Sequence, residues 1–205
     1  MKLQVAIDRV DIPRAEAIIR QVAGAADIVE IGTSLTKEYG LRALAGLTGG
    51  PGPALLADIK TCDEGAYEFD LGYACGFVYL TVMGSSSLGT LEACAASAAA
   101  HGGVMMIDLL ECDEARIERI AGFPDAVYCL HTSVDSGATA APVGQVRAFR
   151  ERFPRIRRIA VAGGITRGQL AGLREAGVEI AIMGSAITKA DDIAAAARDC
   201  KAAMG

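Results

Sequence analysis

The chain contains 205 residues, of which 52% are hydrophobic, and it carries a formal net charge of −5. A chain of this length and composition can bury a full core, and we expect one domain that spans residues 1–205. The acidic balance and the lack of Lys/Arg runs argue against a nucleic-acid partner. Because the sequence shows neither a long apolar span nor a charged-then-apolar leader, we also expect no membrane association and a cytoplasmic location.

Eight short apolar runs that end in polar or glycine residues follow one another along the chain. They cover residues 3–8, 27–32, 54–60, 77–84, 104–108, 126–131, 156–164 and 179–184. Between them lie Ala-, Glu- and Arg-rich stretches with helical spacing, such as residues 12–22 and 88–100. Eight strands alternating with eight helices predict an α/β protein, a single (β/α)₈ TIM barrel. The alternative, an open doubly wound sheet, would require a glycine fingerprint after the first strand, where this chain has Asp8.

Six cysteines are scattered along the chain, namely Cys62, Cys75, Cys94, Cys112, Cys129 and Cys200. They form no C-x-x-C pair and have no histidine-rich cluster nearby in the sequence. We therefore expect reduced thiols in a reducing compartment and no zinc site.

The ends of the predicted strands carry ionisable side chains. In chain order these ends are Asp8, Glu30, Asp58 with Lys60, Thr81, Asp108 and His131. Alternation places Asp58 and Lys60 on the same side of their strand, and the active sites of barrels lie at the carboxyl ends of the strands. Repulsion among carboxylates at one mouth favours a hard divalent cation such as Mg²⁺.

Structural roles could also explain single members of this group. Asp58, Lys60 and Asp63 could form a surface salt-bridge cluster, with Asp63 as the N-cap of a helix over residues 64–74. Asp8 could cap the helix that starts near Ile12, and His131 could be a satisfied strand-end imidazole.

The last two strand ends are rich in small residues instead. Gly163 and Gly164 end the seventh run, and Gly184 and Ser185 end the eighth. Loops after strands 7 and 8 of barrels frequently bind phosphate through backbone N–H groups. A substrate with a terminal phosphate is the expected consequence.

Several motifs together resemble the orotidine-phosphate decarboxylase suprafamily, and within it the 3-hexulose-6-phosphate synthases, which are close to the 3-keto-L-gulonate-6-phosphate decarboxylases. The motifs are residues 1–8 (MKLQVAID), 27–33 (DIVEIGT), the D-x-K-x-x-D unit at 58–63, 161–165 (VAGGI) and 184–188 (GSAIT). The resemblance runs from end to end, and the D-x-K-x-x-D unit with Glu30 is specific to the metal-dependent branch. It implies Mg-dependent aldol condensation of formaldehyde with D-ribulose 5-phosphate through a metal-stabilised 1,2-enediolate, giving D-arabino-3-hexulose 6-phosphate.

The resemblance also implies a role for each matching residue. Glu30 and Asp58 would hold Mg²⁺, Lys60 would stabilise the enediolate, and Asp8 would contact substrate hydroxyls. His131 would be the base or proton donor, and its residue type ordinarily titrates near neutral pH. The phosphate would be bound by Gly163, Gly164, Gly184 and Ser185.

Two further implications concern assembly and specificity. Asp63 would reach into the active site of a partner subunit, so a homodimer with shared active sites is expected. Asp108 stands where the decarboxylases typically carry Glu and the synthases Asp, and Val134 stands where the decarboxylases carry Arg. Both favour the aldehyde-lyase over the carboxy-lyase. The decarboxylase, and a diverged barrel that only binds a sugar phosphate, stay open as alternatives.

Overall fold

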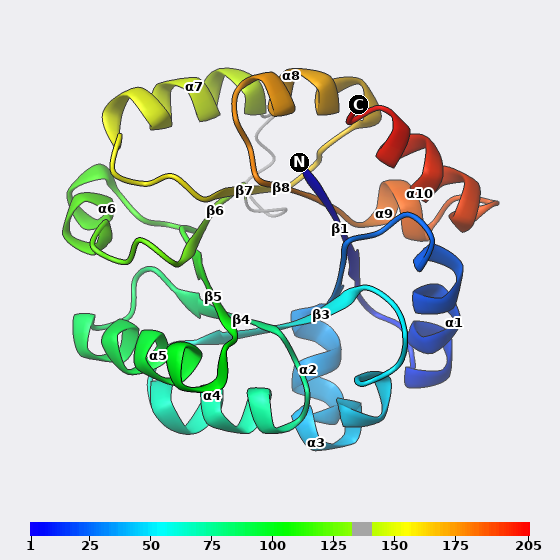
Figure 1. Cartoon of the computed structure of the whole chain (residues 1–205), viewed down its shortest axis with the longest axis horizontal. Coiled ribbons are helices and arrows are strands. Elements are labelled where there is room, and N and C mark those ends of the chain that lie inside the picture. The colour runs from blue at the N-terminus through cyan, green and yellow to red at the C-terminus, as the bar shows by residue number, and fades with distance from the viewer. Residues whose placement is uncertain (133–140) are drawn as a thin grey trace.

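The computed structural model describes residues 1–132 and 141–205. Eight parallel strands close into a barrel in the order β1 to β8. They are β1 (Lys2–Ile7), β2 (Ile28–Ile31), β3 (Ala54–Thr61), β4 (Tyr79–Met83), β5 (Val104–Asp108), β6 (Val127–His131), β7 (Ile159–Ala162) and β8 (Ile180–Met183). Figure 1 shows them as a central ring surrounded by helices. The predicted (β/α)₈ TIM barrel is confirmed.

The helical layer is more divided than predicted. Most connections carry one main helix: α1 (Ile12–Val22), α4 (Gly65–Ala74), α5 (Leu88–His101), α6 (Glu114–Ile120), α7 (Pro142–Arg152) and α8 (Leu170–Glu175). Two connections carry a pair instead, α2 (Thr33–Tyr39) with α3 (Leu41–Leu44) and α9 (Ser185–Thr188) with α10 (Ile193–Ala202). The expectation of eight helices was therefore wrong. Gly40, with φ of 76°, interrupts the helix between α2 and α3, and Asp192 is the N-cap at which α10 begins. None of the described helices has both the length and the apolar composition of a membrane span.

Strand alternation explains why the barrel interior is apolar in its middle and charged at the carboxyl ends of the strands. On β5, Met105 and Ile107 pack outward against the helices, whereas Met106 lies in the barrel interior. Asp108 is two residues beyond Met106 and therefore projects to the same inner side. The same two-residue step leads from Ile28 to Glu30 and from Leu56 to Asp58. On β2, β3 and β5, the inward-facing residues thus change from apolar to ionisable towards the carboxyl ends of the strands.

The N-caps of α1 and α4 show which acidic residues cap these helices. The N-cap of α1 is Asp11, whose carboxylate accepts a hydrogen bond of 2.8 Å from the backbone N–H of Arg14. Asp8 therefore does not cap this helix. The N-cap of α4 is Glu64, in a left-handed conformation without a side-chain capping bond, and Asp63 only accepts from the N–H of Glu64. Neither capping alternative holds.

Candidate active site

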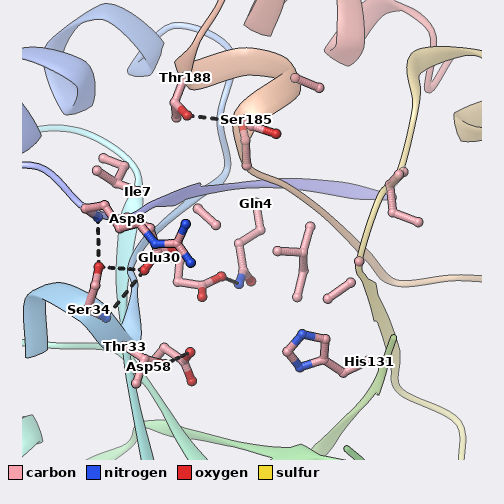
Figure 2. Close-up of a pocket in the computed structure, with 18 of the residues that line it drawn as sticks. Gln4, Ile7, Asp8, Glu30, Thr33, Ser34, Asp58, His131, Ser185 and Thr188 are labelled. Carbon is pink, nitrogen blue, oxygen red and sulfur yellow. Dashed lines mark hydrogen bonds between the residues drawn. The ribbon is translucent and has the colours of Figure 1, made fainter. Parts of the chain in front are cut away.

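A cavity of about 1300 Å³ opens at the carboxyl ends of the strands. It is lined by every predicted site residue except Asp63: Asp8, Glu30, Asp58, Lys60, Asp108, His131, Gly163, Gly164, Gly184 and Ser185. In Figure 2, Asp8, Glu30 and Asp58 lie on one side of the cavity and His131 on the other. Asp8 follows β1 and Ser185 follows β8, and the pairing of these two strands closes the barrel. Residues from the two ends of the chain therefore share one site.

The end of β3 presents Asp58 and Lys60 to the cavity together. The pairing with β4 shifts register between Ala57 and Thr61, and Lys60 has φ of 49°, a left-handed conformation that is costly for a non-glycine residue. The backbone N–H of Lys60 donates to Thr81 Oγ1 at 2.9 Å, which holds this bend. The Lys60 side chain lies beside Asp58 of the same strand, with Lys60 Nζ 3.2 Å from Asp58 Oδ2. The prediction that Asp58 and Lys60 lie on the same side of their strand is confirmed.

Asp108 connects the lysine to the histidine through one oxygen atom. Its Oδ2 lies 2.6 Å from Lys60 Nζ and 2.9 Å from His131 Nδ1, while Oδ1 accepts from the N–H of Leu110. Burial opposes ionisation of Asp108, but the hydrogen bond from His131 and the charge of Lys60 outweigh it and lower its pKa to about 2. An ionised Asp108 can only accept, so it favours the tautomer with the proton on His131 Nδ1. That leaves Nε2 of His131 as a proton acceptor.

Lys60 is held in its charged form by its neighbours. Burial disfavours the ammonium, but the negative charges of Asp58 and Asp108 outweigh burial and raise the pKa of Lys60. The site therefore keeps a fixed positive charge at the cavity wall, suited to stabilising negative charge that develops on a bound substrate.

Glu30 has the opposite balance. Burial, followed by the negative charge of Asp58, raises its pKa to about 8, although the hydrogen bond from Gln4 works against this. Within the described part of the chain, no Lys, Arg or His side chain forms an ion pair with Glu30. An oxygen-seeking cation would remove this energetic conflict.

The donor set fits Mg²⁺. Glu30 and Asp58 are both buried and lie on adjacent strands, and their ligand atoms are carboxylate oxygens. Residues 1–132 and 141–205 contain no cluster of three or more His, Cys, Asp or Glu side chains arranged around a metal position. Mg²⁺ does not require one, because it usually binds through one or two carboxylates and completes its shell with water and substrate oxygens.

Asp8 lies at the exposed rim of the cavity. Its Oδ1 accepts a hydrogen bond of 2.7 Å from Ser34 Oγ, which in turn accepts from the N–H of Arg9. A Cβ atom at Gly32 would lie 2.3 Å from Asp8 Oδ1, so the absence of a side chain at position 32 is a condition for this placement. Both of the hydrogen bonds that Asp8 accepts from described residues come from Ser34 and end on Oδ1, so Oδ2 can contact a ligand in the cavity.

The cavity offers backbone donors at its glycine residues and also has positively charged side chains in its lining. Gly163 and Gly164 have φ of 97° and 66°, and their N–H groups form no main-chain hydrogen bond with described residues. Arg9, Arg14 and Lys189 also line the cavity, and none is paired with a carboxylate of residues 1–132 or 141–205. These features suit an anionic group.

A family model described as "Orotidine 5'-phosphate decarboxylase / HUMPS family" matches residues 1–200. The chain belongs to this family. The 3-hexulose-6-phosphate synthase of Mycobacterium gastri is 31% identical over 210 residues, covering 100% of both chains. The enzyme of the same name from Methylomonas aminofaciens is 32% identical over 96% of this chain and 95% of its own. These relatives bear the name of an aldehyde-lyase. The predicted family resemblance and the prediction that the chain is an enzyme are therefore confirmed.

Two solved structures have the same fold as this chain. The 3-hexulose-6-phosphate synthase from Salmonella typhimurium has a TM-score of 0.91 and 31% identity, covering 100% of this chain and 98% of its own. The 3-keto-L-gulonate-6-phosphate decarboxylase from Vibrio cholerae has a TM-score of 0.83 at 23% identity, over 100% of this chain and 98% of its own. The second likeness concerns the fold alone.

Three kinds of residue need separate mention. Asp63 lies outside the main cavity, in a shallow depression with Tyr67 and Ser87. Gln4 and Thr33 contact the carboxylates but were not predicted as site residues; the sequence signal for Gln4 is an amide inside an otherwise apolar run. Val134, proposed from the sequence to separate synthase from decarboxylase, lies in residues 133–140, outside the described residues.

Proposed function

We propose that this chain condenses formaldehyde with D-ribulose 5-phosphate to give D-arabino-3-hexulose 6-phosphate. The observation that carries the proposal is the shared oxygen of Asp108, which places a charged Lys60 and a proton-accepting His131 on one wall of the cavity. Identity of 31–32% to full-length synthases supports the choice of substrates.

The residues present can carry out the steps. His131 Nε2 would take a proton from C1 of the bound sugar, and Lys60 would stabilise the negative charge that develops on the adjacent oxygen. The electron pair left at C1 would then form the new bond to the formaldehyde carbon. The formaldehyde oxygen would take the proton back from His131. Gly163, Gly164, Gly184 and Ser185 would hold the phosphate, and Asp8 a hydroxyl.

The decisive assay compares two substrates on the purified protein. We expect hexulose phosphate to form from formaldehyde and ribulose 5-phosphate faster than carbon dioxide is released from 3-keto-L-gulonate 6-phosphate. Both rates are measured at the same Mg²⁺ concentration. Faster decarboxylation would instead support the carboxy-lyase, and tight binding of both sugars without turnover would support a barrel that only binds sugar phosphates.

We also propose Mg²⁺ as the cofactor, held by Glu30 and Asp58. When bound, it would supply positive charge next to the two adjacent oxygens of the substrate. Exhaustive chelation is expected to abolish activity, and added Mg²⁺ to restore it. Asp58→Asn should lower the rate by orders of magnitude and leave the fold intact, which circular dichroism checks. Undiminished activity in protein shown by elemental analysis to lack divalent metal would refute this proposal.

A homodimer with shared active sites is proposed from Asp63. Its exposure outside the cavity, beside the 64% exposed side chain of Tyr67, is compatible with a position at a subunit interface. Mixed Asp63→Ala and Lys60→Met subunits should recover activity, because each heterodimer then holds one intact site. Equal random mixing of a two-fold dimer would restore at most about a quarter of wild-type activity. If subunit exchange is demonstrated and activity stays absent, the proposal of a shared site is wrong.

The cytoplasmic location stays a prediction.

A further inference from the structure

Gln4 places an amide group inside the apolar part of the barrel. Its side chain is fully buried, and its Cα partners on the neighbouring strands are Ile28 and Ile182. Buried polar groups are costly unless their hydrogen bonds are satisfied. An amide at this depth therefore calls for a reason other than packing.

Only half of this amide is satisfied. Gln4 Nε2 donates to Glu30 Oε2 at 2.6 Å. Gln4 Oε1 is buried and has no hydrogen-bond partner among the described residues. Gln4 lines the same cavity as Glu30 and Asp58, and Figure 2 shows Gln4 and Glu30 facing each other there.

The orientation of the amide follows from the state of Glu30. A carboxylate that holds a cation is ionised and has only acceptors, so the NH₂ group must face it and the carbonyl oxygen must face away. Leaving such an oxygen unpaired in the interior is energetically costly. This cost indicates that the amide is kept for its donor contact with Glu30.

We propose that Gln4 is a positioning residue for the divalent cation. It fixes Oε2 of Glu30 by hydrogen bonding and so orients that carboxylate for the cation. Groups that orient metal ligands in this way commonly alter metal affinity by about 10- to 100-fold. This inference rests on the proposed role of Glu30 as a metal ligand.

The test measures affinity of the metal-free full chain for Mn²⁺, used as a spectroscopic substitute for Mg²⁺ and followed by electron paramagnetic resonance of the free ion. Gln4→Met keeps the length of the side chain and removes both polar groups, and it should weaken Mn²⁺ binding by about 10- to 100-fold. Gln4→Leu repeats the test with a second apolar side chain if the first variant does not fold. Ile182→Leu, at the Cα partner of Gln4 on β8, is the matched control and should bind Mn²⁺ as wild type does.

A double variant separates positioning from a general packing defect. In a Glu30→Gln background, Gln4→Met should cause no further loss of Mn²⁺ affinity, because the carboxylate that Gln4 orients is already gone. Equal Mn²⁺ affinity of wild type and Gln4→Met would overturn the inference and leave the metal proposal standing. Additive losses in the double variant would overturn it as well. If wild type itself binds no Mn²⁺, the metal proposal fails, and the role of Gln4 fails with it.

Discussion

Lys60→Met is expected to lower hexulose phosphate formation by about 100- to 1000-fold, the usual effect of removing one preorganised charge from a developing anion. Lys60 Nζ is the ammonium that contacts both Asp58 and Asp108 at the cavity wall. Methionine fills a similar volume but leaves those two carboxylates without their cation. The substrate would then meet net negative charge where it needs positive charge.

Two measurements make this prediction specific. Exchange of the C1 proton of ribulose 5-phosphate in D₂O, without formaldehyde, should fall in parallel with condensation, because both need the same stabilised anion. Lys37→Met, at an exposed position on α2, serves as the control and should leave both rates unchanged. Retention of more than a tenth of wild-type activity by folded Lys60→Met would contradict the assigned role.

Glu30→Gln is expected to abolish activity while stabilising the metal-free protein above pH 5. The pKa of Glu30 is raised to about 8 in the folded chain from 4.5, first by burial and then by the charge of Asp58. Between these values the folded state holds a proton that the unfolded state has released. The free energy of unfolding therefore falls as pH rises from about 4.5 to about 8. Glutamine has no proton to lose, so the variant should lack this slope.

Urea denaturation at pH 5 and pH 8 measures the difference. Wild type without metal should lose stability over this interval and regain it when Mg²⁺ is added, whereas Glu30→Gln should show a smaller loss and a smaller gain. The exposed Glu38→Gln change on α2 should preserve the wild-type slope. An identical pH dependence in wild type and Glu30→Gln would show that Glu30 does not carry the cost assigned to it.

The barrel could be predicted because its information is local. On β2, β3 and β5 the inward-facing residues change from apolar to ionisable at the strand end, as in Met106 followed by Asp108, and this change is visible as a two-residue period. The division of the helical layer could not be predicted as readily. Short helices such as α9, with four residues, have too few turns to produce a clear 3.6-residue pattern.

The site could be predicted as a set of residues but not as a set of contacts. Parallel strands bring their carboxyl ends to one mouth, so Asp8, Glu30 and His131 could be grouped from topology alone. The left-handed Lys60 and its bond to Thr81 depend on a register shift that no local sequence pattern reveals. The role of Gln4 likewise depends on the register of β1 against β2 and on a side-chain hydrogen bond to Glu30, neither of which the sequence shows.

The single oxygen of Asp108 shared by Lys60 and His131 ties the charge of the base to that of its neighbour. In the proposed reaction, a protonated His131 and the Lys60 ammonium would share this one acceptor atom. If the formaldehyde oxygen then takes the proton from His131, the base regains its starting form without proton exchange with solvent. Proton return and recovery of the base for the next turnover would thus be one step of the proposed reaction.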